Sequence, residues 1–409
     1  MPTSYQTPGV YVEEVSMGTR PIAAAGASTA ALVGIAPDAG AHLNEPFACN
    51  SWSQFVREFA PEGSATTALA HAVFGFFMNG GSRCYVLNLG KGGSIAGDPR
   101  KRTGLYALEA IDEVAIVAAP GYTGISDYEA LLSHCEGLGD RVAILDAPLE
   151  VDNVDALKKV GTASAPAGPA GDEAKKEDAK KADGKGMRPR NSDRGFGALY
   201  FPWIVARDPL DPGADPKNIP PSGHMAGIYA RTDATRGVHK APANEVVRGA
   251  VGLSYRVARA EQGELNSAGV NCIRFFPDAG IRVWGARTLA EEASEWRYVN
   301  VRRLFNVIEE SIARGTRWTV FEPNDFSLWQ AVTRDVGAFL TLLWRDGALV
   351  GSTPAQAFFV KCDAETNPPE VVDAGRLVIE VGVAPVKPAE FIIFRIGQWS
   401  GGSEVETAA

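Results

Sequence analysis

The sequence lacks the residue patterns that mark most enzymes, metal sites and secreted scaffolds. Its five cysteines lie far apart with no Cys-x-x-Cys pair, which argues against a zinc site or disulfide framework and for isolated reduced thiols. Its five histidines form no His-x-x-x-His pair. No Gly-x-Ser-x-Gly elbow and no Gly-x-x-x-x-Gly-Lys-[Ser/Thr] phosphate loop is present,. We therefore expect no catalytic residues, no cofactor and no metal ligands.

Positive charge and long apolar segments are also scarce. The 409 residues include 40 Lys and Arg against 49 Asp and Glu, a formal net charge of −9 at pH 7. A general nucleic-acid binder usually presents a basic surface, so we expect no nucleic-acid partner. No stretch approaches the roughly 20 apolar residues that span a bilayer, and Met1–Tyr5 begins no signal-peptide pattern,. We expect no direct membrane insertion and assembly in the cytoplasm.

What the chain does contain is typical of a large globular protein. Its hydrophobic fraction is 45% and its charged fraction 22%, which suffices for a sizeable core in one large domain or two. The segments Val114–Ala118, Ser126–Leu138 and Val142–Leu145 predict strand, helix and strand, hence a βαβ unit in an α/β domain,. Residues 161–191 contain hardly any large apolar side chain, so we expect a disordered surface loop there.

The second half of the chain predicts a different unit, with long helices and short strands. Tyr298–Arg314 and Ser327–Trp344 each carry an apolar stripe at helical spacing,. Residues 271–276 and 280–284 predict a hairpin closed around a Pro-Asp-Ala turn,.

Both ends of the chain predict strands that have no partner in their own subunit. The C-terminal segment Phe391–Ile396 is strongly apolar, and the start Pro8–Val15 is strand-like. An apolar strand left as a bare sheet edge invites aggregation, so something must pair with it. Two such arms at opposite termini are what a subunit needs if it completes sheets in its neighbours.

Seven segments form a long, ordered pattern that is more specific than composition. They are PGVYVEE from Pro8, PPSGHMAGIYARTDATRGVHKAPAN (220–244), LNSAGVNCIRFFPDAGIRVWGARTL (265–289), WRYVNVRRLFNVIEESI (296–312), FEPNDFSLW (321–329), AFFVKCD (357–363) and GVAPVKPAEFIIF (382–394). Together they resemble the tail sheath proteins of contractile phages and of phage-tail-like injection particles. The resemblance is strongest over residues 220–396 and at the N-terminal arm, and weaker over 47–205.

The resemblance implies a structural subunit that forms stacked hexameric rings, a helical array, around an inner tube protein. Baseplate and terminal cap proteins are the further partners that it implies. The arms of neighbouring subunits then join a sheet in an adjoining C-terminal domain, which is β-augmentation. The candidate strand residues are Val10, Tyr11, Val12, Phe391, Ile392, Ile393, Phe394 and Ile396.

The resemblance also implies a fold class and a division of the chain. The fold is a mixed α/β (α+β) multi-domain subunit with extended strand arms. Its parts are an N-terminal strand arm (1–24), a variable outer α/β domain (25–240, containing the 161–191 loop), a C-terminal inner core domain (241–388), and a C-terminal strand arm with a tail (389–409). Contact with the tube is expected from exposed arginines on the two C-terminal helices. These tube-facing candidates are Arg302, Arg303, Arg334 and Arg345.

The implied mechanism is mechanical and uses no nucleotide or cofactor. The extended sheath is metastable, and its contraction drives the tube through a target envelope. The particle is a phage tail or a phage-tail-like particle that leaves the cell by lysis, and the segment 296–312 favours the latter. Two alternatives remain open. A soluble α/β enzyme would show a pocket with converging polar groups, and another self-assembling shell protein would form planar or closed assemblies.

Overall fold

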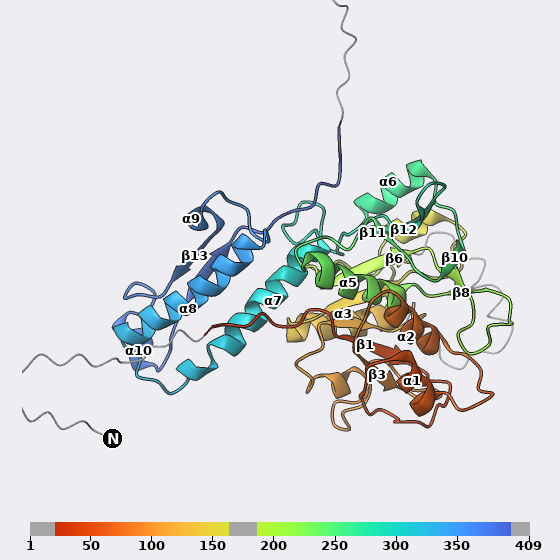
Figure 1. Ribbon diagram of the computed structural model, residues 1–409, viewed down its shortest axis with the longest axis horizontal. Coiled ribbons are helices and arrows are strands. Elements are labelled where there is room, and N and C mark those ends of the chain that lie inside the picture. The colour runs from red at the N-terminus through yellow and green to blue at the C-terminus, as the bar shows by residue number, and fades with distance from the viewer. Residues whose placement is uncertain (1–20, 163–185, 394–409) are drawn as a thin grey trace, which may run out of the picture.

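The computed structural model describes residues 21–162 and 186–393, and it shows a larger and a smaller unit joined by the long helix α7, Val299–Gly315 (Figure 1). The larger unit is built on a nine-stranded sheet with the order β2-β3-β1-β4-β5-β6-β11-β12-β9. Its strands are β1 (Ala30–Gly34), β2 (Phe47–Cys49), β3 (Cys84–Asn88), β4 (Ile116–Ala118), β5 (Val142–Asp146), β6 (Gly197–Phe201), β9 (Glu245–Val246), β11 (Val270–Phe276) and β12 (Gly280–Val283).

The centre of this sheet is parallel and buried on both faces. Strand β1 pairs in parallel with β3 and β4, and the parallel ladder continues through β5 and β6 to β11. All five residues of β1 are buried, which explains why this strand is a continuous apolar run without alternation. A second sheet has the order β10-β7-β8. It comprises β7 (Ile204–Ala206), β8 (Lys217–Ile219) and β10 (Ala250–Leu253).

Helices cover both faces of the large sheet. These helices are α1 (Trp52–Phe59), α2 (Ala68–Met78), α3 (Ile125–Leu138), α5 (Ser222–Arg236) and α6 (Arg259–Ser267), with short 3₁₀ turns η1 (Gly104–Leu108) and η2 (Val154–Lys158). On one face α1, α2 and α5 form a core with alternate strand residues. On the other face α3, α6 and the 3₁₀ turns form a second core. The sandwich of helix, sheet and helix gives the mixed α/β class that the sequence predicts.

In the smaller unit the long helices α7 and α8 run antiparallel and lie beside a two-stranded sheet (Figure 1). The elements of this unit are α7 (Val299–Gly315), η3 (Arg317–Thr319), α8 (Phe326–Arg345), α9 (Pro354–Ala357), β13 (Phe358–Lys361), α10 (Pro369–Asp373) and β14 (Glu380–Val383). The N-terminus of α8 is capped by Asp325, whose side chain accepts a hydrogen bond from the Leu328 N–H at 3.0 Å,. The apolar stripe of α8 packs against Leu304 and Ile308 of α7 and against Ile22.

Most predicted elements agree with the structure to within two residues, but the predicted division of the chain does not. The sheet of the larger unit includes β9, β11 and β12, so the boundary predicted between residues 240 and 241 falls inside it. The correction places the change of unit after β12, where α7 begins. Sequence reasoning missed this because β11 joins the sheet through its parallel pairing with β6, about 70 residues earlier.

The predicted loop 161–191 also needs correction at both ends. The Gly161 N–H donates to the Arg188 carbonyl at 2.8 Å, and the Arg188 guanidinium is buried and donates to the Ala268 carbonyl at 2.6 Å. These ends are therefore packed against the larger unit. Residues 163–185, on which the rest of that prediction falls, lie outside the described residues.

Candidate assembly interface

The smaller unit contains a sheet of only two strands. Strands β13 and β14 pair antiparallel with the register Phe358↔Val383 to Lys361↔Glu380. Within residues 21–162 and 186–393 no third strand pairs with either of them. Isolated two-stranded sheets are only marginally stable in water. Pairing with a further strand would therefore stabilise this sheet.

Backbone hydrogen bonds identify the free edge of β14. The Ala384 N–H donates to the Ala357 carbonyl at 2.8 Å. The Val378 N–H donates to the Asn367 side chain at 2.7 Å, and the Asn367 amide donates to the Val378 carbonyl at 3.0 Å. Successive residues of an antiparallel strand direct their backbone N–H and C=O groups to opposite sides. Residues 378 and 384 face the side of β13, so every second residue from 377 to 383 directs its N–H and C=O away from β13. These outward residues are Leu377, Ile379, Val381 and Val383, whose side chains pack towards α8.

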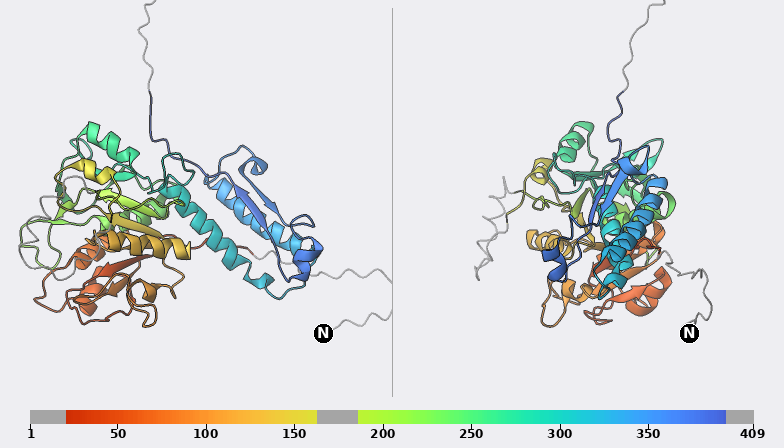
Figure 2. Two further views of the ribbon diagram at one scale, coloured as in Figure 1. Left: turned by 180° about the vertical axis from the view of Figure 1, so that it is seen from behind. Right: turned by 90° about the vertical axis from the view of Figure 1, so that its left-hand side faces the viewer.

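The chain leaves the body of the molecule as an exposed apolar segment. Phe391, Ile392 and Ile393 are 72%, 74% and 79% exposed. Figures 1 and 2 show this dark blue segment projecting away from both units. Three consecutive large apolar side chains in water are unfavourable for a free monomer, so this segment needs a partner surface. The other predicted arm residues, Val10, Tyr11, Val12, Phe394 and Ile396, lie outside the described residues.

The N-terminal linker, residues 21–29, runs along α7 before it enters β1 (Figure 1). Ile22 is buried beside Gly315 at the C-terminal end of α7. The Ala25 N–H donates to the Ser311 hydroxyl at 2.8 Å, and the Arg303 guanidinium donates to the Ala27 carbonyl at 2.9 Å. The described part of the linker is thus bound along α7.

Two of the four arginines predicted to face the tube are not exposed, which corrects that expectation. Arg303 is 2% exposed and forms an ion pair with Asp233 of α5, and its guanidinium lies 4.7 Å from the Tyr229 ring centroid. Burial would lower the pKa of Arg303, but the Asp233 carboxylate raises it above its usual value. The pair joins α7 to α5, so Arg303 holds the two units together.

Arg302 is also buried, with no exposed surface. Its guanidinium lies 4.3 Å from the Trp296 ring centroid and 4.7 Å from that of Phe196, and its Nε donates to Asn306 at 2.7 Å. Burial lowers the pKa of Arg302 below its usual value. Only Arg334 and Arg345 are exposed, and their role as tube-facing residues stays a prediction.

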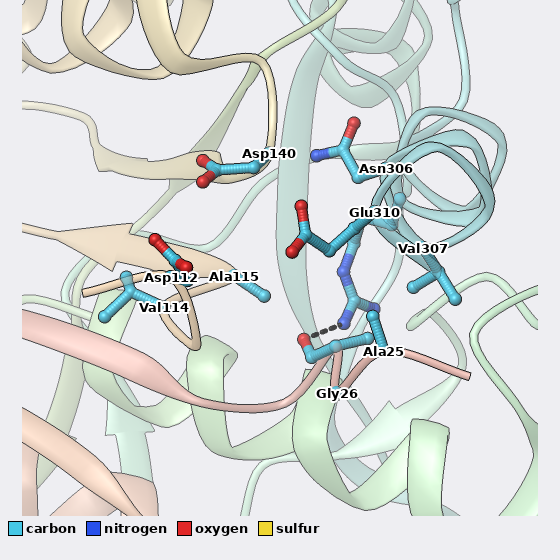
Figure 3. Close-up of a pocket in the computed structure, with 11 residues that line it drawn as sticks. Ala25, Gly26, Asp112, Val114, Ala115, Asp140, Asn306, Val307 and Glu310 are labelled. Atoms are coloured by element: carbon cyan, nitrogen blue, oxygen red, sulfur yellow. Dashed lines mark hydrogen bonds between the residues drawn. The ribbon is translucent and has the colours of Figure 1, made fainter. Parts of the chain in front are cut away.

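One small cavity lies between the N-terminal linker, the turn before β4 and α7 (Figure 3). Three carboxylates surround it, from Asp112, Asp140 and Glu310. Its volume is about 20 Å³, enough for about one water molecule. Asp140 is paired with Arg141 at 2.6 Å and Glu310 with Arg314. The cavity is too small for a substrate, and its acidic groups neutralise neighbouring cations.

A larger apolar hollow of about 370 Å³ is lined by His71, His224 and Asp208. Burial lowers the pKa of His71, and it lowers the pKa of His224 to about 3, so both rings are neutral at pH 7. Asp208 accepts hydrogen bonds from Thr66 and from the N–H groups of residues 210 and 211. None of the residues that line the hollow is a Ser, Cys or Lys.

The structure bears out the expected free thiols but corrects the expectation that they are isolated, because Cys49 and Cys84 lie opposite one another on β2 and β3. All five cysteines are buried and free of disulfides, and burial raises the pKa of the thiol of Cys49 to about 12. Among the described residues no group of three or more His, Cys, Asp or Glu is placed to hold a metal ion. In that same part of the chain, none of the helices has the length and hydrophobicity needed to cross a membrane.

Comparison with protein families gives two consecutive matches. Residues 177–289 match the phage tail sheath protein central domain, and residues 291–398 match the phage tail sheath C-terminal domain. The junction between them lies close to the change of unit in the structure.

Solved structures extend the similarity to nearly the whole chain. The sheath of an extracellular contractile injection system, PVC, in the contracted state has a TM-score of 0.72 and 31% identity, covering 98% of this chain and 99% of that one. The helical sheath of the anti-feeding prophage in the contracted state has a TM-score of 0.72 and 28% identity, covering 97% and 100%.

Phage and prophage relatives are covered less completely. A putative prophage major tail sheath protein of Pseudomonas aeruginosa is 27% identical over 75% of this chain and 72% of its own length. The tail sheath protein of Vibrio phage KVP40 is 29% identical over 42% of this chain, and the matched part is only 26% of that protein. Because the similarity to a contractile sheath subunit reaches 31% identity over almost the full length of both chains, this chain belongs to the family of contractile tail sheath proteins and is a structural sheath subunit.

Proposed function

We propose that this subunit polymerises as stacked hexameric rings around an inner tube protein and contracts to drive that tube through a target envelope. The observation that carries the proposal is the combination of a two-stranded sheet with an open β14 edge and an exposed apolar segment, Phe391–Ile393. The segment of one copy supplies a strand, and the β14 edge of another copy receives it. Main-chain hydrogen bonds then provide affinity, while the alternating side chains fix the register.

The positions of the two arms favour an open array over a closed dimer. Ile22 lies beside Gly315, at the C-terminal end of α7, and Glu390 accepts a hydrogen bond from Tyr298, at its N-terminal end. A helix of 17 residues is about 25 Å long, since each residue rises about 1.5 Å. Arms that leave from opposite ends of one helix reach different neighbours, and such heterologous contacts generate helical assemblies.

Contraction in this proposal needs no bond chemistry. The arms keep neighbouring copies connected while the bodies move as rigid units into a lattice with more buried contact, and the released free energy moves the tube. Arg334 and Arg345 are the remaining candidates for the tube contact, because polar contacts can be strong enough to assemble and weak enough to break. Baseplate and cap proteins would bind at the two ends of the sheath. The sheath would assemble in the cytoplasm and be released as part of a phage-tail-like particle.

Removal of the C-terminal arm tests the proposal directly. We expect deletion of residues 391–409 to leave both units folded, because the described part of this segment is exposed and contributes nothing to either core. Polymer formation, measured by sedimentation and negative-stain electron microscopy, should be lost. The matched control is Phe275→Ser, which removes another exposed aromatic side chain, 53% exposed on β11, and should leave the polymer intact.

An unchanged polymer from the shortened chain would contradict the proposal. If the shortened chain forms tubes of the same length and yield as the full chain, strand addition by the C-terminal arm is not what joins the subunits.

A further inference from the structure

The point at which the C-terminal arm leaves the body is marked by one side chain, Glu390. Its side chain is 18% exposed, whereas the next residue, Phe391, is 72% exposed. Glu390 is therefore the last fixed residue before the exposed segment. The residues that receive it come from α6, from the segment after β12 and from the residue preceding α7.

Hydrogen bonds from three side chains, those of Arg287, Asn266 and Tyr298, converge on the Glu390 carboxylate. The Arg287 guanidinium donates from Nε to Oε1 at 2.9 Å and from Nη2 to Oε2 at 2.8 Å. The Asn266 amide donates to Oε1 at 2.6 Å, and the Tyr298 hydroxyl donates to Oε2 at 3.2 Å. A bidentate, charge-assisted pair of this kind fixes the orientation of a carboxylate as well as its position.

The receiving arginine is held rigidly by the larger unit. Arg287 is 4% exposed. Its backbone N–H donates to the Asn271 side chain at 2.7 Å, and its carbonyl accepts from the Asn271 amide at 2.7 Å. Asn271 is fully buried on β11. The position of the guanidinium is thus set by the central sheet, independently of the arm.

The linker before Glu390 is tied down more weakly. The Val386 N–H donates to the Ala348 carbonyl at 3.1 Å, and its carbonyl accepts from Asn300 at 3.2 Å. Pro385 and Pro388 have no N–H to donate, although their rings restrict the backbone. A short, stiff linker therefore leads from β14 in the smaller unit to Glu390 on the larger unit.

The charges around Glu390 favour its ionised form. Burial alone would raise the pKa of Glu390, but hydrogen bonds from Arg287 and Asn266 outweigh burial and hold the pKa below its usual value. Arg287 is the cation in contact with it, and the second carboxylate on Arg287 is Glu292 at 3.3 Å.

We propose that Glu390, Arg287, Asn266 and Tyr298 form a latch that fixes the place and direction in which the C-terminal arm leaves the subunit, and that assembly depends on this latch. The inference rests on the proposed function, because it concerns how the arm reaches its neighbour. An arm held in one direction loses less conformational freedom when it binds, and its effective concentration at the neighbouring edge is higher. Glu390 is thus a positioning residue for assembly.

The direction of the arm can be measured without assembly. Spin labels on cysteines placed at Phe391 and at the exposed Arg259 of α6 report the distance between arm and body by double electron–electron resonance, while the five native cysteines are buried. We expect a single narrow distance distribution in the otherwise unchanged chain. In Glu390→Gln, which cannot form the charged bidentate pair, the narrow peak should be lost.

Glu292→Gln is the matched control, because Glu292 is also bound to Arg287 but is exposed and does not contact the arm. Glu292→Gln should keep the narrow distance distribution and the polymer yield. Glu390→Gln should lose both, while its unfolding midpoint stays unchanged. A narrow peak in Glu390→Gln, or equal effects of the two substitutions, would overturn the latch. If Glu390→Gln also lowers the unfolding midpoint, the test passes to Tyr298→Phe, which removes only one hydrogen-bond donor to Glu390. This variant should still broaden the distance distribution. An unchanged distribution would mean that Glu390 stabilises the fold and does not position the arm.

Failure of the latch and failure of the proposed function remain distinguishable. Loss of polymer on deletion of residues 391–409, together with normal polymer from Glu390→Gln, would reject the latch alone. Normal polymer from the deletion would reject strand addition by the arm, whatever the result for Glu390.

Discussion

Asp146, at the end of β5, is a buried carboxylate with a specific structural task. Its Oδ1 accepts from the Ser222 N–H at 2.8 Å, and its Oδ2 accepts from the Ser222 hydroxyl at 2.7 Å and from the Gly121 N–H at 3.1 Å. It thereby joins the central sheet to the first residue of α5. Burial nevertheless raises the pKa of Asp146 to about 6, even though these hydrogen bonds act to lower it.

A pH dependence of stability follows from this raised pKa. The unfolded carboxyl has a pKa of about 3.9, so the folded state binds the proton more tightly. The contribution of Asp146 to stability is fully present below about pH 4 and is lost as pH rises through about 6, by up to about 3 kcal/mol. In Asp146→Asn, which cannot ionise, this slope should disappear. Urea unfolding of both proteins at several pH values measures the difference, and equal slopes would contradict the assignment.

The buried pair of Arg303 and Asp233 permits a second prediction at this scale. Asp233→Asn leaves the Arg303 guanidinium buried without its counter-charge, so we expect the free energy of unfolding to fall by about 3–5 kcal/mol. The control is Glu113→Gln, which breaks the exposed pair with Arg83 and should cost at most about 1 kcal/mol. Urea unfolding measures the free energy of unfolding of both variants. Similar decreases in the two would show that the buried pair contributes no more to stability than the exposed one.

The same arginine shows where residue-level prediction from sequence fails. Arg302 and Arg303 are neighbours on α7, and the expectation of exposure assumed that a helix buries one stripe only. Helix α7 is instead covered by the larger unit, by α8 and by the N-terminal linker, so adjacent residues on it are both buried. On α8, which leaves one face free, the prediction that Arg334 and Arg345 point outwards is confirmed.

At the scale of elements, the contact between α7 and the N-terminal linker depends on a glycine. A Cβ added to Gly315 would lie 2.5 Å from the side chain of Ile22, so Gly315→Ala must displace the linker. We expect a loss of roughly 1–3 kcal/mol, typical of overpacking. On α8, Gly337 has nothing within 4 Å of such a Cβ, and Gly337→Ala should stabilise the protein by about 0.5–1 kcal/mol. Thermal unfolding distinguishes the two; stabilisation by both substitutions would mean that Ile22 is not held tightly.

Local patterns predicted the helices well because the signals are contained within each element. The apolar stripes of α7 and α8 gave their bounds to within two residues, and the hairpin of β11 and β12 was predicted from its turn. The latch at Glu390 had no such signal, since Arg287 lies 103 residues away from it in the chain.

At the scale of the molecule, the exposed arm and the open sheet edge are the two halves of the contact that we propose between copies. Neither half is satisfied within the described residues, because β14 has no partner on its outer edge and Phe391–Ile393 is exposed. The apolar character of the C-terminal arm predicted that segment, whereas the N-terminal arm, predicted from its strand-like pattern, lies outside the described residues. The sequence could not predict that the sheet of β13 and β14 has two strands within the described residues, because that depends on how the chain after α8 folds back on the helix.

Net charge determines how this contact should respond to salt. Each copy carries a formal charge of −9, so approaching copies repel one another, whereas strand addition through backbone and apolar groups is insensitive to screening. Raising NaCl from roughly 50 to 300 mM shortens the Debye length and should increase the yield of polymer. Sedimentation at each salt concentration measures the yield, and the chain without residues 391–409 should stay dispersed throughout. A yield that falls with salt would mean that complementary charged surfaces, rather than the apolar arm, hold the copies together.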